Sequence, residues 1–189
     1  MLTCRQVINK TVITSDGRIL GKMESVIVDD SWKIPLLSIS LERSVAERFR
    51  IRKPILGTPK AFLPPSEVSA LSDNVILERR LADMAEHLQE RGAGMKVSKL
   101  LGRKVMGEDG YYFGDLDDMN IDQAHWKVSE LILEVRKKAA DEMGFPMTLF
   151  GTCKAKVPVK RVKEVRDHIY LSLGPSEFKE YVVKERSRD

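Results

Sequence analysis

The stretch that decides the fold is "SDGRILGKMESVIVDD", residues 15–30, because its pattern of an Asp-Gly pair and a following glycine is repeated in "GEDGYYFGDLDDMNID" at residues 107–122. In each stretch an Asp-Gly pair supplies the positive-φ residue of a tight hairpin turn. A glycine four residues further on, Gly21 or Gly114, stands where the return strand begins, a common place for a bulge or a sharp bend. A hairpin repeated at a spacing of 93 residues indicates an internal duplication.

The repeat extends along most of the chain. Val12 and Val105 match at the spacing of 93, and one extra residue then changes the spacing to 94, which pairs Trp32 with Trp126. From there "LGTPKAFLPPSEVSALSDNVIL" (56–77) runs beside "FGTCKAKVPVKRVKEVRDHIYL" (150–171) without a gap. We therefore predict two domains, residues 1–92 and 93–189, joined near "ERGAGM" at 90–95.

Each copy is predicted to be mainly β. Besides the hairpin, the strands expected in copy one are 32–42, 61–64 and 74–77, and those in copy two are 126–135, 155–158 and 168–171. Five or six short strands with glycine corners are typical of a small, closed or nearly closed barrel. Each barrel is expected to be followed by a short amphipathic helix.

The composition limits the function classes. The 189 residues contain 32 Lys and Arg against 28 Asp and Glu, a balance too even to indicate nucleic-acid binding. Two cysteines without a CxxC pair indicate a reducing compartment and neither a disulfide framework nor a zinc knuckle. The first residues, "MLTCRQVINK", lack the apolar region of a signal peptide, and no apolar run approaches the length of a membrane span. We expect a cytoplasmic protein.

The hairpin and the strand that follows it carry a family resemblance. "LLGRKVMGEDGYYFGDLDDMNID" (100–122), a hydrophobic strand and "KAKVPVKRVKEVRDHIYL" (154–171) resemble the PRC-barrel family, and the resemblance covers both copies. It implies two tandem small PRC-type β-barrels, each followed by a short amphipathic helix. Copy one departs from the family pattern at Asn9, where copy two keeps Gly102, so an altered first strand is expected there.

The resemblance also implies a function. Two-barrel archaeal members of the family are similar to cell-division adaptors that connect to SepF, the membrane anchor of the FtsZ ring, and assemble with paralogous PRC-barrel proteins. It therefore implies a non-enzymatic protein–protein adaptor, a homo- or hetero-dimer that is recruited to the division site and meets the membrane only indirectly. The alternative is an RNA or ribosome-maturation factor in the manner of RimM, another family member. A metabolite or metal sensor ranks last, because small barrels are usually filled by their own side chains.

Two sets of residues are candidate binding surfaces. The apolar faces of the terminal helices could bind a partner, or each helix could simply cap its own barrel; these residues are Leu81, Met84, Leu88, Phe178, Tyr181 and Val182. A basic run that copy one lacks could bind an acidic protein or RNA phosphates, or be merely solvated; it comprises Lys154, Lys156, Lys160, Arg161 and Lys163. In "ERFRIRKP" (47–54) we predict Arg48, Arg50 and Arg52 on one face of an extended segment.

The sequence shows no catalytic constellation. His87, His125 and His168 lack metal-ligand spacing. The acidic segment 115–122 lacks the glycine and the closing acid of an EF-hand loop, so a solvated acidic face is expected. Since a Ser-His-Asp set and a phosphate-binding glycine loop are also missing, we predict no enzyme, cofactor or metal.

Overall fold

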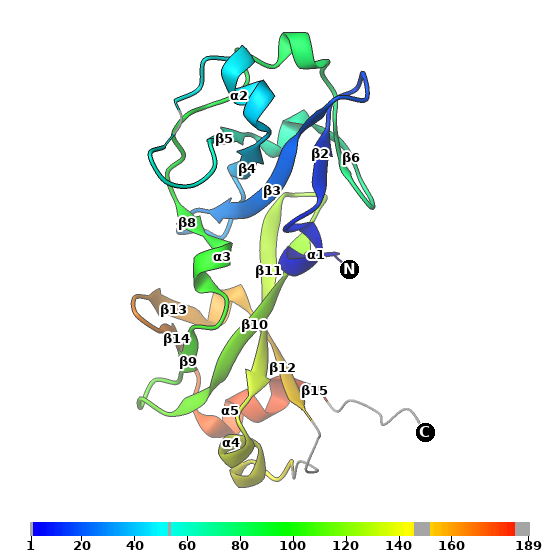
Figure 1. Ribbon diagram of the computed structural model, residues 1–189. Coiled ribbons are helices and arrows are strands. Elements are labelled where there is room, and N and C mark those ends of the chain that lie inside the picture. The colour runs from blue at the N-terminus through cyan, green and yellow to red at the C-terminus, as the bar shows by residue number, and fades with distance from the viewer. Residues whose placement is uncertain (1, 53, 146–151, 184–189) are drawn as a thin grey trace. The chain divides into compact units, whose positions relative to one another are not determined.

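The computed structural model describes residues 2–52, 54–145 and 152–183, which form two compact units (Figure 1). The N-terminal unit comprises Leu2–Ser98 together with Asp122–Lys127. The C-terminal unit comprises Lys99–Ile121 and the described part of Val128–Asp189. The segment Asp122–Lys127, the tip of a later hairpin, is therefore part of the N-terminal unit, although the chain enters the C-terminal unit at Lys99.

The N-terminal unit is built on one sheet with the strand order β5-β4-β3-β2-β7-β6, and β8 pairs with β3. Neighbouring strands are antiparallel except β2 and β7, which are parallel. The elements are β1 (Leu2–Thr3), α1 (Cys4–Val7), β2 (Thr11–Ile13), β3 (Ile19–Val28), β4 (Leu36–Leu41), α2 (Arg43–Arg48), β5 (Lys60–Leu63), η1 (Pro65–Glu67), β6 (Val68–Leu71), β7 (Val75–Leu77), η2 (Leu81–Asp83) and β8 (Met95–Lys96).

The C-terminal unit repeats this order as β12-β11-β10-β9-β14-β13, and β15 is added beside β12. Its parallel pair, β9 and β14, matches β2 and β7. The elements are α3 (Val97–Leu100, which begins in the N-terminal unit), β9 (Lys104–Met106), β10 (Tyr112–Asp122), β11 (Lys127–Val135), α4 (Lys137–Glu142), β12 (Cys153–Pro158), η3 (Val159–Arg161), β13 (Val162–Val165), β14 (Ile169–Leu171), α5 (Pro175–Phe178), η4 (Lys179–Tyr181) and β15 (Val182–Val183).

The prediction of a mainly β protein is confirmed, and its strands form two sheets. In each sheet the main strand order is a linear path with one further strand paired beside it, and the strands at the two ends of the path do not pair with each other among the described residues. Within those residues, each sheet is therefore open rather than a closed barrel. No helix in the described ranges is both long enough and apolar enough to cross a membrane.

The duplication also appears in the backbone angles. Trp32 and Trp126 both have positive φ, at 63° and 45°, and Arg50 (53°) matches Gly144 (80°). The expectation of an altered first strand at Asn9 is wrong, because Asn9 adopts φ 71° where Gly102 has 80°, and the strands that follow are equally long. Asparagine tolerates the left-handed region better than most residues.

The glycine that follows each hairpin turn is required by a close approach between strands. A Cβ built on Gly21 would lie 2.1 Å from the carbonyl oxygen of Ser40, and one on Gly114 would lie 2.0 Å from that of Glu134. A bulge accompanies each glycine, since the register shifts between β2 and β3 and between β9 and β10. Only a residue without a side chain lets the neighbouring backbone come this close.

The predicted helix after the first sheet is wrong. Residues Leu81–Asp83 form a single 3-10 turn, η2, followed by further turns. The carboxylate of Asp16 in the hairpin turn accepts a hydrogen bond from the Leu81 backbone N–H at 3.0 Å, which fixes the start of η2. The second copy does begin a short helix, α5, but η4 and β15 follow it.

The extended segment predicted for Arg48, Arg50 and Arg52 is also wrong. Arg48 ends α2, whose buried Val45 and Ala46 pack into the unit, and the positive φ of Arg50 then turns the chain. Arg48 and Arg50 therefore do not share the face of a strand.

Candidate interaction surfaces

Three of the six residues predicted to bind a partner are buried within their own unit: Leu81, Met84 and Phe178. The Phe178 ring stacks on that of Phe113, with centroids 3.9 Å apart and planes 8° from parallel. Leu88, Tyr181 and Val182 are half-buried. The buried residues fit the alternative in which each terminal segment caps its own sheet.

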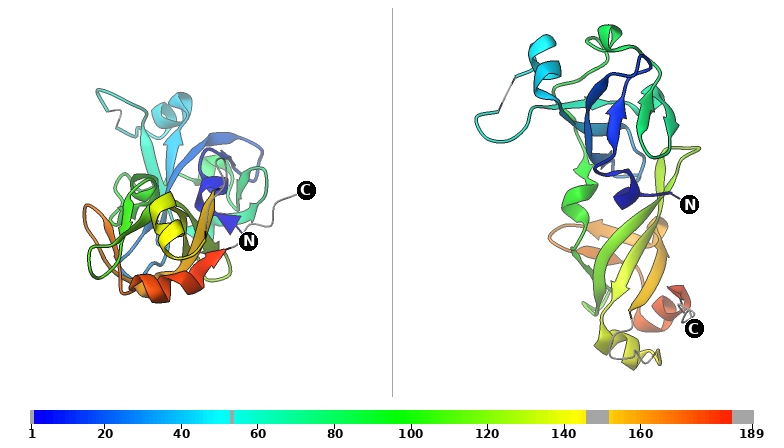
Figure 2. Two further views of the ribbon diagram at one scale, coloured as in Figure 1. Left: turned by 90° about the horizontal axis from the view of Figure 1, so that it is seen from below. Right: turned by 45° about the vertical axis from the view of Figure 1, so that its right-hand side comes forward.

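A loop of the N-terminal unit presents apolar side chains that sequence reasoning missed. Ile55 is 103% exposed and Leu56 is 89% exposed, in the segment between α2 and β5. The described part of this loop, 54–59, projects away from the sheet of its own unit in both views of Figure 2. A signal exists in the sequence, since the next copy carries Leu149 and Phe150 at the matching positions, which lie outside the described residues.

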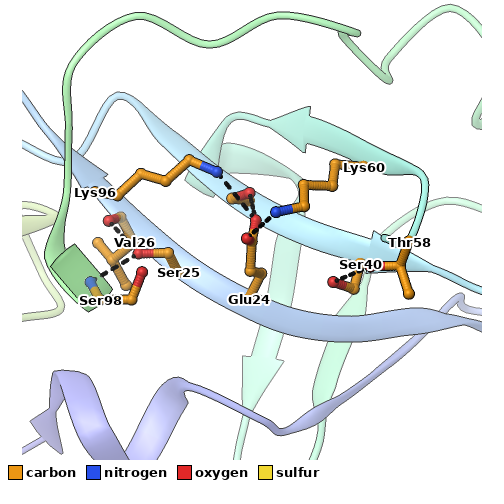
Figure 3. A network of polar contacts seen from close by, with 9 residues as sticks. Glu24, Ser25, Val26, Ser40, Thr58, Lys60, Lys96 and Ser98 are labelled. Atoms are coloured by element: carbon orange, nitrogen blue, oxygen red, sulfur yellow. Dashed lines mark hydrogen bonds and ion pairs between the residues drawn. The ribbon is translucent and has the colours of Figure 1, made fainter. Parts of the chain in front are cut away.

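A polar network covers one face of the N-terminal sheet (Figure 3). Glu24 on β3 accepts hydrogen bonds from the Ser38 hydroxyl at 2.6 Å and from Lys96 Nζ at 3.2 Å, and it also pairs with Lys60. Burial would raise the pKa of the Glu24 carboxyl, but the hydrogen bonds from Lys60, Ser38 and Lys96 outweigh it and hold this pKa below its usual value.

The same brace recurs in the C-terminal unit. Asp117 on β10 and Lys154 on β12 occupy the positions that match Glu24 and Lys60, and their charged atoms lie 3.4 Å apart. The carboxylate of each pair is partly exposed to solvent and is neutralised by lysine. We therefore interpret both pairs as links between strands of one sheet rather than as reactive groups.

The five residues of the predicted basic patch lie on three elements of the C-terminal unit. Lys154 and Lys156 are on β12, Lys160 and Arg161 on η3, and Lys163 on β13. Lys163 lies 3.8 Å from Glu108, and Arg161 Nε donates to the Tyr181 hydroxyl at 3.2 Å. Lys156 and Lys160 are exposed, and no acidic partner is found for them in the described part of the chain. The patch therefore carries less unpaired charge than its sequence suggests.

The two units differ at one pair of matching positions. In the N-terminal unit the buried Glu67 carboxylate lies 3.1 Å from His87 Nδ1 and 2.9 Å from Arg79 Nε. In the C-terminal unit the positions of Glu67 and His87 are taken by Arg161 and Tyr181, which form the hydrogen bond described above. The same scaffold thus holds an acid–histidine contact in one copy and an arginine–tyrosine contact in the other.

The solvated acidic face expected at 115–122 is wrong for part of the segment, which lies in β10. Asp118 and Asn120 are buried in the strand, and the Asn120 side chain donates to Glu130 Oε2 at 2.8 Å. His125 at the hairpin tip pairs with Asp122 at 2.9 Å. Among the described residues, no group of three or more His, Cys, Asp or Glu side chains could hold a metal ion. Cys4 and Cys153 are both buried.

No protein-family model matches the chain, and no curated protein matches it either.

Proposed function

We propose that the protein is a non-enzymatic protein–protein adaptor of the archaeal SepF and FtsZ division machinery, cytoplasmic and recruited to the division site. In this proposal each sheet is the framework of a PRC-type barrel. The partner is SepF or a paralogous PRC-barrel protein, and the assembly is a homo- or hetero-dimer that contacts the membrane only through its partners. The observation that carries the proposal is the exposed pair Ile55 and Leu56.

Two adjacent large apolar side chains left almost fully in water indicate a surface that is covered in the assembled state. Burying a leucine or isoleucine side chain stabilises a protein by about 1.5–3 kcal/mol, and neither Ile55 nor Leu56 contributes this stabilisation while it is exposed. A partner that covers both would recover it, and such small apolar centres dominate many protein interfaces.

The divergence between the two units supports an adaptor with two different contacts. Glu67 and His87 give one unit an acid–histidine contact, whereas Arg161 and Tyr181 give the other an arginine–tyrosine contact. Since both pairs sit on the same framework, the fold does not require either chemistry, and their half-buried members His87 and Tyr181 could give the two units different partner contacts.

Affinity purification of the tagged protein from its native cells, with and without nuclease, tests the proposal. We expect SepF or a second PRC-barrel protein to be recovered whether or not nuclease is present. The double variant Ile55→Ser/Leu56→Ser should lose this partner. Ile19→Ser is the matched control, since Ile19 is 52% exposed in the same unit but lies in β3 rather than in the loop.

Recovery of neither protein would refute the adaptor, and equal recovery with the double variant would refute the assignment of the loop. The alternative, a RimM-like RNA factor, is favoured only by the exposed Lys156 and Lys160. It predicts ribosomal proteins that disappear on nuclease treatment.

A further inference from the structure

A cluster of aromatic and basic side chains lies at one end of the C-terminal sheet. Arg136 directly follows β11, and its backbone N–H donates to the Phe113 carbonyl at 2.9 Å. Its guanidinium lies over the ring of Tyr112, 4.9 Å from the centroid, and Lys104 Nζ lies 5.4 Å from the same centroid. Two cations therefore share one aromatic ring, which holds both by attraction to its face.

The Arg136 guanidinium has hydrogen-bonding capacity that the described chain does not use. Its Nε is buried without an acceptor, and no other hydrogen bond or ion pair of this side chain occurs in the residues that the structure describes. A guanidinium carries five donors in a rigid fork, and buried donors in proteins nearly always have partners. Arg136 is only half-buried, so part of the side chain remains in contact with solvent.

The nearby acids are engaged by tyrosines instead of by Arg136. The Tyr112 hydroxyl donates to Asp115 Oδ1 at 2.8 Å, and the Tyr111 hydroxyl donates to Glu142 Oε2. Burial, and then the hydrogen bond to Glu142, raises the pKa of Tyr111 to about 12, so this phenol stays protonated and remains a donor. The arrangement leaves the guanidinium ordered by ring stacking while its carboxylate neighbours are occupied.

The N-terminal unit shows that the fold does not need this cluster. The positions that match Arg136, Tyr112 and Lys104 are Glu42, Ile19 and Thr11. The same strands and the same helix start therefore form with an acid, an aliphatic residue and a hydroxyl in these places. A cluster found in one copy only, with an unused guanidinium at its centre, indicates a binding role.

We propose that Arg136, with Tyr112 and Lys104, forms a binding site for carboxylate side chains of an acidic peptide segment in a partner protein. Arginine pairs well with carboxylates through parallel hydrogen bonds, and arginine and tyrosine are enriched at the energetic centres of interfaces. A singly charged carboxylate suits the site better than a phosphate dianion, because Asp115 and Glu142 would repel the second charge. The inference rests on the proposed function only in placing the peptide within a partner.

Titration of the full-length protein with a hexaglutamate peptide, followed by ¹⁵N–¹H spectra of the arginine Nε–H groups, tests the site directly. The Arg136 peak, assigned from its loss in Arg136→Lys, should shift as the peptide binds. Arg136→Gln should weaken binding at least tenfold, and Arg136→Lys should weaken it less because the charge remains. Arg18→Gln, which removes one exposed charge from the other unit's hairpin, should change the affinity less than twofold.

An unshifted Arg136 peak, or equal weakening by Arg18→Gln, would overturn the proposal. Inorganic phosphate in a parallel titration should shift the peak less than the peptide does, and a larger shift with phosphate would refute the choice of carboxylate. Should Arg136→Gln fail to fold, Lys104→Gln replaces it. Lys104→Gln should weaken peptide binding about threefold, and unchanged binding would contradict the site. Peptide binding with no partner in the affinity purification would uphold the site and refute the adaptor.

Discussion

Replacing Gly21 with alanine should destabilise the N-terminal unit more than any other single added methyl group at a glycine with ordinary backbone angles. The new Cβ would lie 2.1 Å from the Ser40 carbonyl oxygen and 2.9 Å from the Leu41 Cα, both backbone atoms of the neighbouring strand β4. These atoms cannot rotate away as a side chain could, so β3 and β4 must separate near the Gly21–Leu41 pair.

The size of the effect follows from two contributions. Overpacking costs about 1–3 kcal/mol. Separating the strands also strains or breaks backbone hydrogen bonds, each costing about 1–3 kcal/mol when its groups are left buried and unpaired. We expect Gly21→Ala to lower the free energy of unfolding by about 3 kcal/mol or more, and the Tm by about 6–12 °C.

Urea unfolding followed by tryptophan fluorescence measures this, because both tryptophans, Trp32 and Trp126, belong to the N-terminal unit. Gly17→Ala is the matched control. Gly17 has φ 73° but no atom within 4 Å of its added Cβ, so this change carries only the backbone strain of about 1–2 kcal/mol. The reasoning is refuted if Gly21→Ala costs no more than Gly17→Ala.

Three further changes test other features. Asn9→Ala should cost about 1 kcal/mol in urea unfolding because of the positive φ at this position, whereas Asn9→Gly should be nearly neutral, and equal losses would contradict the backbone explanation. The lowered pKa of Glu24 stabilises the fold above the usual pKa of a glutamate, and this stability is lost as the pH falls through the folded-state pKa. The Tm should therefore fall less steeply between about pH 5 and 2 for Glu24→Gln than for the unchanged protein. Equal slopes of Tm against pH would contradict this explanation. Cys4 and Cys153 should react with a thiol reagent only at the rate of unfolding, and prompt labelling of the native protein would show that they are less protected than their burial indicates.

The strands could be predicted because they depend on local turn and glycine signals that occur in both copies of the duplication. Two copies of an Asp-Gly turn and a following glycine bend, Gly21 and Gly114, fix where each hairpin turns and where adjacent backbones approach. Comparing the copies misled the prediction at Asn9, because asparagine adopts nearly the same positive φ as Gly102 and the first strand is unchanged.

The helix predicted over Leu81, Met84 and Leu88 failed because apolar spacing alone does not supply helix length. Leu81 and Met84 are buried as the pattern requires, but the Asp16 hydrogen bond to the Leu81 N–H holds a single 3-10 turn in place. This hydrogen bond joins residues 65 positions apart, so it could not be predicted from the residues next to Leu81.

The candidate surfaces were harder to predict, since burial and exposure depend on the whole unit. The repeat keeps large apolar residues at the positions of Ile55 and Leu56, but only the fold shows that these two side chains are in solvent. Lys104, Tyr112 and Arg136 come from three different strands or strand ends, and their meeting on one ring depends on the β9-β10-β11 order. The acid–lysine braces were equally hidden, because their partners lie on separate strands.

The hairpin tip Asp122–Lys127 has a consequence for synthesis on the ribosome. The backbone N–H of Ile34 donates to the Trp126 carbonyl at 2.8 Å, and Lys33 bridges to Lys127, so the N-terminal unit is incomplete until this tip has been made. At about 5–20 residues per second, translation from Lys99 to Lys127 takes about 1.5–6 s. During that delay the nascent first half lacks both the Ile34–Trp126 hydrogen bond and the Lys33–Lys127 bridge, and a chaperone could bind the unfinished unit.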